Sequence, residues 1–253
     1  MTNAPYLSVV IPAYNEAKRI GASVRRVLDY LRSQPYTWEF IVVDDGSKDE
    51  TVEVVRQAGG DAVRIISYQP NRGKGGALQV GMLEAAGEIV LFSDADLSTP
   101  IEQIATFLPW FEQGYEVVIG SRKMRGAQIA VKQPLLRRLG GKAFTWLSNL
   151  ILGVRVSDAT CGFKAWTRRA AREVFSRQTI PGWGFDSEVL LIAHRLGFRI
   201  KEVPVRWADN AASRVSLLRD TGRSFVELLR IRIKAWRGYY GEKRERAADK
   251  PES

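Results

Sequence analysis

The first half of the chain alternates between short apolar runs and stretches with helical spacing. The apolar runs cover residues 7–12, 40–43, 63–66, 89–92 and 117–120. A short, continuous apolar run is typical of a strand buried on both faces of a mostly parallel sheet. Apolar residues recur every three or four positions in residues 17–33, 77–86 and 100–113, which predicts helices there. The alternation predicts an α/β fold: a mostly parallel sheet flanked by helices.

The alternation stops after Gly120. Helical spacing predicts further helices over residues 135–152, 170–177, 186–196 and 217–236. Residues 158–164 are expected to form a loop that leads into a strand, and residues 200–205 alternate as a strand does. The helices at 135–152 and 217–236 are both amphipathic and rich in Lys and Arg, so they can meet either a protein surface or a membrane surface.

Two carboxylates one residue apart follow the apolar run at 89–92. In extended chain, Asp94 and Asp96 point the same way, and ligands bind beyond the carboxyl ends of parallel strands. Two neighbouring carboxylates repel each other unless a cation lies between them. Mg²⁺ or Mn²⁺ carrying a diphosphate would fit, since Mg²⁺ takes one or two carboxylates plus substrate phosphates. The alternative is a turn at the strand end with solvated aspartates.

Charge is distributed unevenly along the 253 residues. Residues 1–120 hold 10 Lys/Arg and 16 Asp/Glu, a net charge of −6, whereas residues 121–253 hold 28 and 12, a net charge of +16. The basic half favours a nucleic acid, an anionic membrane surface or an anionic substrate as partner. Cys161 is the only cysteine, which excludes an internal disulfide and favours a reducing compartment. We expect neither a signal peptide nor a membrane-spanning helix.

Four ordered motifs resemble those of family 2 glycosyltransferases with the GT-A fold. They are Val9-Val10-Ile11-Pro12-Ala13-Tyr14-Asn15-Glu16, Val42-Val43-Asp44-Asp45-Gly46-Ser47, Asn71-Arg72-Gly73-Lys74-Gly75-Gly76-Ala77-Leu78 and Asp94-Ala95-Asp96. Later motifs resemble the polyprenyl-phosphate hexosyltransferase branch, which includes dolichyl-phosphate glucosyl- and mannosyltransferases. They are Asp94–Pro100, Gly120–Arg122, Asp158–Lys164, Trp183–Glu188 and Ser213–Ser216.

The resemblance implies a set of site residues. It assigns donor binding to Pro12, Tyr14, Glu16, Asp45, Lys74, Asp94, Ala95 and Asp96. It assigns the metal to Asp94 and Asp96, the acceptor phosphate to Arg122 and Arg214, and catalysis to Asp96, Arg122 and Arg214. Other interpretations stay open: Glu16 as a solvated helix start, Asp44 as a turn cap, and residues 72–75 as a tight turn that needs glycine rather than a phosphate cradle.

A phosphate monoester acceptor simplifies the chemistry that the resemblance implies. Its second pKa is about 6, so near neutral pH it is already a dianion and needs no general base. The protein must instead bring this dianion close to a diphosphate, which calls for cations. Arginine suits the task because its planar fork binds phosphate oxygens in pairs.

The expected organisation is a catalytic GT-A domain at residues 1–212, an amphipathic basic helix at 213–240 and a polar disordered tail at 241–253. Trp146, Phe225 and Trp236 would lie at a membrane interface, with Lys and Arg facing anionic lipid. Packing on the sheet or a dimer contact is the alternative. We therefore expect a peripheral protein on the cytoplasmic face of a membrane, either as a homodimer or with a separate membrane-anchor subunit.

These expectations combine into one functional hypothesis. The chain would transfer glucose from the nucleotide-sugar donor UDP-glucose to dolichyl or undecaprenyl phosphate, with inversion and with Mg²⁺ or Mn²⁺ as cofactor. The nearest rival is transfer of mannose from GDP-mannose. Rivals of other classes are a basic nucleic-acid-binding module and an inactive scaffold; no nucleic-acid motif is found, so we expect no nucleic-acid partner.

Overall fold

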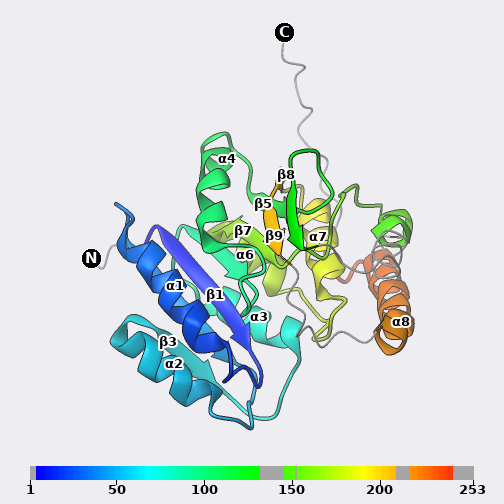
Figure 1. Cartoon of the computed structure of the whole chain (residues 1–253). Coiled ribbons are helices and arrows are strands. Elements are labelled where there is room, and N and C mark those ends of the chain that lie inside the picture. The colour runs from blue at the N-terminus through cyan, green and yellow to red at the C-terminus, as the bar shows by residue number, and fades with distance from the viewer. Residues whose placement is uncertain (1–3, 132–144, 152, 209–216, 242–253) are drawn as a thin grey trace.

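A seven-stranded sheet forms the centre of the molecule (Figure 1). The computed structural model describes residues 4–131, 145–151, 153–208 and 217–241, with residues 131 and 217–225 described by their backbone alone. The order of the strands is β3-β2-β1-β4-β7-β5-β8. Their bounds are Leu7–Ala13 (β1), Trp38–Asp44 (β2), Arg64–Ser67 (β3), Ile89–Ser93 (β4), Val117–Ser121 (β5), Phe163–Thr167 (β7) and Ile200–Pro204 (β8).

The helices cover both faces of this sheet. They are Ile20–Arg32 (α1), Thr51–Gly59 (α2), Lys74–Glu84 (α3), Leu108–Glu112 (α4), Arg168–Phe175 (α6), Phe185–Arg195 (α7) and Leu217–Trp236 (α8), with 3₁₀ turns at Gly60–Ala62 (η1) and Ile101–Thr106 (η2). One apolar core joins the sheet to α3, α6, α7 and α8, and a second joins it to α1, α2 and η2. Burial from both sides explains why β4 is apolar from Ile89 to Phe92.

Most of the sheet is parallel, as the alternation predicted, but β7 is not. It lies between β4 and β5 and runs antiparallel to both. The amino end of β7 therefore lies at the same edge of the sheet as the carboxyl end of β4, and Ser93 pairs with Phe163. This reversal brings the residues just before β7 against the aspartates that follow β4.

The prediction of one continuous helix over residues 100–113 is wrong, because the helical structure there is interrupted. The structure has the 3₁₀ turn η2, a break at Phe107 and then the short helix α4. Pro109 explains the break, because proline lacks the backbone N–H that would continue the hydrogen bonding of η2 but is tolerated in the first turn of α4. A small second sheet, which the sequence did not suggest, pairs Gln128–Val131 (β6) with Arg206–Ala208 (β9).

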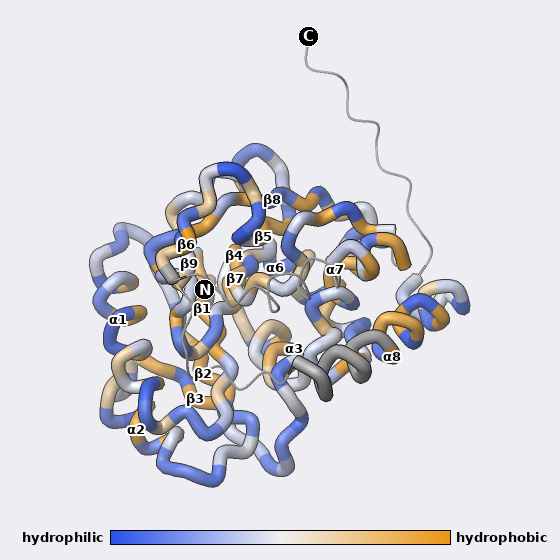
Figure 2. The backbone as a smooth tube through the Cα atoms, turned by 45° about the vertical axis from the view of Figure 1, so that its right-hand side comes forward, coloured by the Kyte–Doolittle hydropathy of each residue, from blue (hydrophilic) through white to orange (hydrophobic). Residues whose placement is uncertain are grey.

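The last helix has the bounds that its periodicity predicted, Leu217–Trp236. Figure 2 shows it at the edge of the molecule away from α1 and α2, with apolar and polar positions alternating over its coloured part. Residues 145–151 of the predicted helix at 135–152 are helical, and the others lie outside the described residues. So does the predicted tail beyond Gly241. Across the described ranges, no helix combines the length and apolar character needed to cross a membrane.

Candidate active site

The candidate site lies where β1, β2 and β4 end, the edge at which open α/β sheets bind ligands. Asp94 follows β4 directly, and its side chain is 36% exposed. Lys74 Nζ, from the start of α3, lies 2.5 Å from Asp94 Oδ1. Asp96 is less exposed, and its Oδ1 accepts a hydrogen bond from Ser98 N (3.0 Å), which closes the turn after the strand.

A cation that sequence analysis missed reaches the second carboxylate. Arg19 Nη1 lies 3.8 Å from Asp96 Oδ2, and Arg19 Nη2 donates to Glu16 Oε1 at 2.7 Å. The hydrogen bond with Glu16 raises the pKa of Arg19; burial opposes this, and the charges of Glu16, Asp96 and Asp94 add to it. Glu16 therefore does not start a helix as a solvated carboxylate. It holds an arginine beside the aspartate pair.

Electrostatic contacts show that both aspartates belong to one site. Burial alone would lower the pKa of Lys74, but the charges of Asp94, Asp186 and Asp96, with a hydrogen bond to Asp94, raise it. The charge of Asp94 also acts on Arg19 and on Arg122. Lys74 and Arg19 thus contact the two aspartates directly, and Arg122 lies within electrostatic reach of Asp94.

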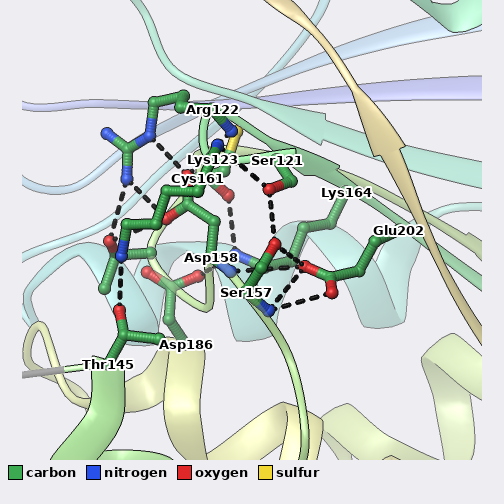
Figure 3. A network of polar contacts seen from close by, with 11 residues as sticks. Ser121, Arg122, Lys123, Thr145, Ser157, Asp158, Cys161, Lys164, Asp186 and Glu202 are labelled. Carbon is green, nitrogen blue, oxygen red and sulfur yellow. Dashed lines mark hydrogen bonds and ion pairs between the residues drawn. The ribbon is translucent and has the colours of Figure 1, made fainter. Parts of the chain in front are cut away.

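Arg122 follows β5 and is held by a buried carboxylate (Figure 3). Its Nε donates to Asp158 Oδ2 at 2.7 Å and its Nη2 to Asp158 Oδ1 at 2.8 Å, a two-pronged pair, and Nη2 also donates to Thr160 Oγ1. Asp158 is fully buried. Burial alone would raise the pKa of Asp158, but the hydrogen bonds and the charge of Arg122 together outweigh burial and lower it. The carboxylate therefore stays ionised and fixes the arginine.

Glu202 of β8 supports this pair from behind. Its carboxylate accepts hydrogen bonds from Ser157 N, Ser157 Oγ and Asp158 N at 2.7 to 3.2 Å. Ser157 Oγ also shares a hydrogen bond with Ser121 Oγ at the end of β5 (2.7 Å). Figure 3 shows the chain of contacts from Glu202 through Ser157 and Asp158 to Arg122. The orientation of Arg122 is thus determined by two strands at once.

Asp45 occupies a position that sequence analysis did not foresee. Its Oδ1 accepts hydrogen bonds from Tyr68 Oη and Arg72 N, and its Oδ2 from Asn71 Nδ2 and Gly73 N, each at 2.8 Å. The carboxylate thus holds the turn that leads into α3 and so places Lys74. Asp44 caps a turn, as one interpretation had it, by accepting from Ser47 N.

The remaining predicted donor residues line the ends of β1 and β4. Pro12 lies inside β1, and Tyr14 follows the strand with 37% of its surface exposed. Ala95 lies between the two aspartates, and its carbonyl accepts a hydrogen bond from Ser23 Oγ at 2.6 Å. Arg214 lies outside the described residues. The donor, metal and acceptor roles of all these residues stay predictions.

Comparison with known proteins decides the family. The family model described as glycosyl transferase family 2 matches residues 8–175. The chain belongs to glycosyltransferase family 2. It is 38% identical to a dolichyl-phosphate beta-glucosyltransferase of Trichomonas vaginalis over 84% of this chain and 68% of the relative. It is 36% identical to the dolichyl-phosphate beta-glucosyltransferase of Homo sapiens over 91% of this chain and 77% of that relative.

Solved structures agree with the fold. This glycosyltransferase resembles mannosyl-3-phosphoglycerate synthase from Rubrobacter xylanophilus with a TM-score of 0.69 at 20% identity, over 97% of this chain and 79% of that one. It resembles glucosyl-3-phosphoglycerate synthase from Mycobacterium tuberculosis, solved with Mn²⁺, UDP-glucose and phosphoglyceric acid, with a TM-score of 0.63 at 25% identity over 90% and 79%. The expected family and GT-A fold are confirmed.

Two further carboxylates of the glycosyltransferase have structural contacts. Glu188 accepts hydrogen bonds from Thr179 N (2.9 Å), Ile180 N (2.7 Å) and Tyr240 Oη (2.6 Å). Asp186 pairs with Lys164, which is fully buried in β7 and also donates to the Cys161 carbonyl at 2.7 Å. Cys161 is a small buried residue as expected, and burial raises the pKa of its thiol to about 11.

Gly162 permits the close approach of β7 to the aspartates. A Cβ atom at this position would lie 1.9 Å from Asp94 Oδ2. Gly162→Ala is therefore expected to displace the Asp94 side chain and reduce transfer by about 100-fold, the typical effect of misplacing one catalytic contact. The measurement is kcat together with the urea midpoint. Equal kcat for the variant and the parent would contradict this geometry.

Proposed function

We propose that this glycosyltransferase transfers glucose from UDP-glucose, with inversion, to a polyprenyl phosphate of the dolichyl type. The names of relatives at 36–38% identity support this acceptor and sugar. The observation that carries the proposal is the pairing of Asp94 with Lys74 and of Asp96 with Arg19 at one sheet edge, with Arg122 within electrostatic reach of Asp94. Such a site suits two phosphate-bearing substrates brought close together.

The aspartates fit a divalent ion. Carboxylate oxygens are the ligands that Mg²⁺ and Mn²⁺ prefer. Asp94 and Asp96 already form ion pairs with Lys74 and Arg19, which shows that this edge of the sheet attracts cations. Across the described ranges, no group of three or more His, Cys, Asp and Glu side chains could hold a metal ion without further ligands, so the donor would have to supply the rest. Two carboxylates plus a diphosphate would complete the ligand set. When bound, the ion supplies Lewis-acid stabilisation of the departing UDP.

The other charged residues supply binding and orientation. Lys74 and Arg19 would hold the diphosphate of the donor, and Arg122 the phosphate of the acceptor. Because Asp158 and Glu202 fix the guanidinium, the Arg122 side chain loses little conformational entropy when the acceptor phosphate binds. The acceptor dianion attacks the anomeric carbon from the face opposite UDP, so the glucose inverts and no base is required.

Arg122→Lys tests the acceptor assignment. Lysine keeps the charge but loses the two-pronged pair with Asp158 that orients Arg122. We expect KM for a short-chain polyprenyl phosphate to rise about tenfold while the Kd for UDP with Mn²⁺ changes less than twofold. Arg56→Lys, at an exposed arginine of α2, is the matched control. A rise in the UDP Kd with an unchanged acceptor KM would contradict the assignment.

We propose a peripheral position on the cytoplasmic face of the membrane that holds the acceptor. Exposed apolar side chains on α8 and on residues 145–151 support the membrane contact, and the single buried cysteine suits a reducing compartment. The homodimer and the separate anchor subunit stay predictions.

A donor panel tests the function. The protein is incubated with Mn²⁺, a polyprenyl phosphate and UDP-glucose, UDP-galactose or GDP-mannose, and lipid-linked sugar is measured. We expect product from UDP-glucose at least tenfold faster than from the others. Consumption of GDP-mannose alone would overturn the sugar assignment. Salt-steep DNA binding without any transfer would favour the nucleic-acid rival.

A further inference from the structure

Helix α8 has an inner and an outer face over residues 226–237. The inner side chains are buried, with exposed fractions of 6% or less; they are Glu227, Leu228, Ile231 and Ala235. The outer apolar side chains are between 42% and 85% exposed; they are Val226, Leu229, Ile233 and Trp236. These outer positions recur every three or four residues, so they form one stripe along the helix.

The charges beside this stripe select its partner. Arg230, Arg232 and Arg237 are exposed, whereas Glu227, the one acidic residue between 226 and 241, is buried. An apolar stripe flanked by arginines fits a lipid surface that carries negative charge. Trp146 and Leu150 add a second exposed apolar surface, 67% and 66% exposed.

Both surfaces rest on α7. Ser148 Oγ donates to Ser187 Oγ of α7 at 3.1 Å, and α8 packs against the same helix. We place one lipid surface against Trp146, Leu150 and the outer stripe together, and this arrangement requires α8 to stay packed on α7. Lipid contact thus favours the packed state of α8 over any other.

The inner face of α8 holds residues 178–184, which we call the linking segment. Glu227 Oε2 accepts a hydrogen bond from Gly184 N at 2.9 Å, and Lys234 Nζ donates to Thr179 Oγ1 at 2.7 Å. Tyr240, just beyond the helix, donates to Glu188, which in turn holds Thr179 N and Ile180 N. The position of the linking segment is therefore set by α8.

The linking segment packs against the start of α3, where Lys74 lies. Gly76 N donates to the Pro181 carbonyl at 3.2 Å, and Gln178 Nε2 donates to the Gly75 carbonyl at 2.8 Å. A Cβ at Gly73 or Gly75 would come within 2.7 Å of a carbonyl oxygen of the segment, so the approach is as close as glycine allows. The Trp183 ring lies 5.4 Å from Lys74 Nζ.

We infer that α8 couples contact with an anionic lipid surface to donor binding, through the linking segment and Lys74. The inference rests on the proposed function, because Lys74 is there assigned to the donor diphosphate. The two states are α8 packed and α8 released, and lipid biases the first. Coupling is reciprocal, so a bound donor strengthens membrane contact as much as lipid strengthens donor binding.

Binding of UDP with Mn²⁺ to the full chain, measured by calorimetry, tests the coupling. Titrations are run with and without vesicles of phosphatidylcholine and phosphatidylglycerol in equal parts. We expect vesicles to lower the Kd for UDP about fivefold, the lower end of typical coupling. Vesicles of phosphatidylcholine alone are expected to change it less than twofold.

Glu227→Ala removes the hydrogen bond between α8 and Gly184 N and leaves the outer face intact. It is expected to bind vesicles as the parent does, while vesicles no longer change its Kd for UDP. Glu227→Gln keeps an oxygen acceptor for Gly184 N and should retain the fivefold effect. Thr179→Val removes the contact with Lys234 without touching α8 and should weaken the coupling. Glu53→Ala, an exposed carboxylate on α2, is the matched control.

Each outcome decides a separate point. A Kd that vesicles do not change in the parent overturns the inference and leaves the proposed function standing. Coupling that persists in Glu227→Ala overturns the route through the linking segment. Absence of UDP binding under both conditions overturns the proposed function, and the inference with it.

Discussion

Replacing Asp96 with asparagine is expected to reduce glucosyl transfer by about a thousandfold. Asparagine keeps the oxygen that accepts the hydrogen bond from Ser98 N, so the turn after β4 is retained. The negative charge that faces Arg19 and the predicted metal is lost. Removing one preorganised electrostatic group typically costs 10²- to 10³-fold in kcat, and loss of a metal ligand belongs at the upper end.

The measurement is kcat with UDP-glucose over a series of Mn²⁺ concentrations, with circular dichroism as the check on folding. Asp61→Asn, an exposed aspartate in η1, makes the same chemical change away from the site. Turnover of Asp96→Asn within twofold of the parent would rule out the metal assignment.

Lys164→Met is expected to lower the free energy of unfolding by about 3 kcal/mol. Lys164 is fully buried in β7, and its ammonium is paired with Asp186 and with the Cys161 carbonyl. Its loss leaves the Asp186 carboxylate buried without that partner, and breaking a buried pair costs about 3–5 kcal/mol. The lower end applies because Lys74 also lies within electrostatic reach of Asp186.

Urea unfolding at neutral pH measures this change. The double variant Lys164→Met with Asp186→Leu removes both charges and is expected to regain most of the loss, since apolar replacement of a buried pair is often neutral. Lys48→Met, at an exposed lysine, should stay within 0.5 kcal/mol of the parent, as most surface changes do. A loss equally small for Lys164→Met would mean that the pair contributes nothing to stability.

Local patterns were sufficient for much of the fold. The continuous apolar run before Asp94 predicted a strand buried on both faces, and β4 is buried throughout. The apolar spacing of residues 217–236 predicted α8 and its end at Trp236. These features depend on neighbours a few positions apart along the chain, which the sequence displays directly.

Long-range features could not be predicted in the same way. The sequence of a strand does not indicate its direction in the sheet, so the antiparallel orientation of β7 could not be predicted. This orientation brings Gly162 next to Asp94. Arg19 was missed because its second partner, Asp96, is far away in sequence. The role of Glu202 likewise depends on the return of β8 beside β5. Folding creates these neighbours, and one sequence alone does not reveal them.

The four hydrogen bonds to Asp45 have a thermodynamic consequence for the predicted donor site. They immobilise the turn from Tyr68 to Gly73 during folding, before any nucleotide arrives. The conformational entropy of this backbone segment is thus lost during folding, and binding causes no further loss at each catalytic cycle. A site that is rigid before binding loses less free energy to ordering than a flexible site, so the same contacts give a higher affinity.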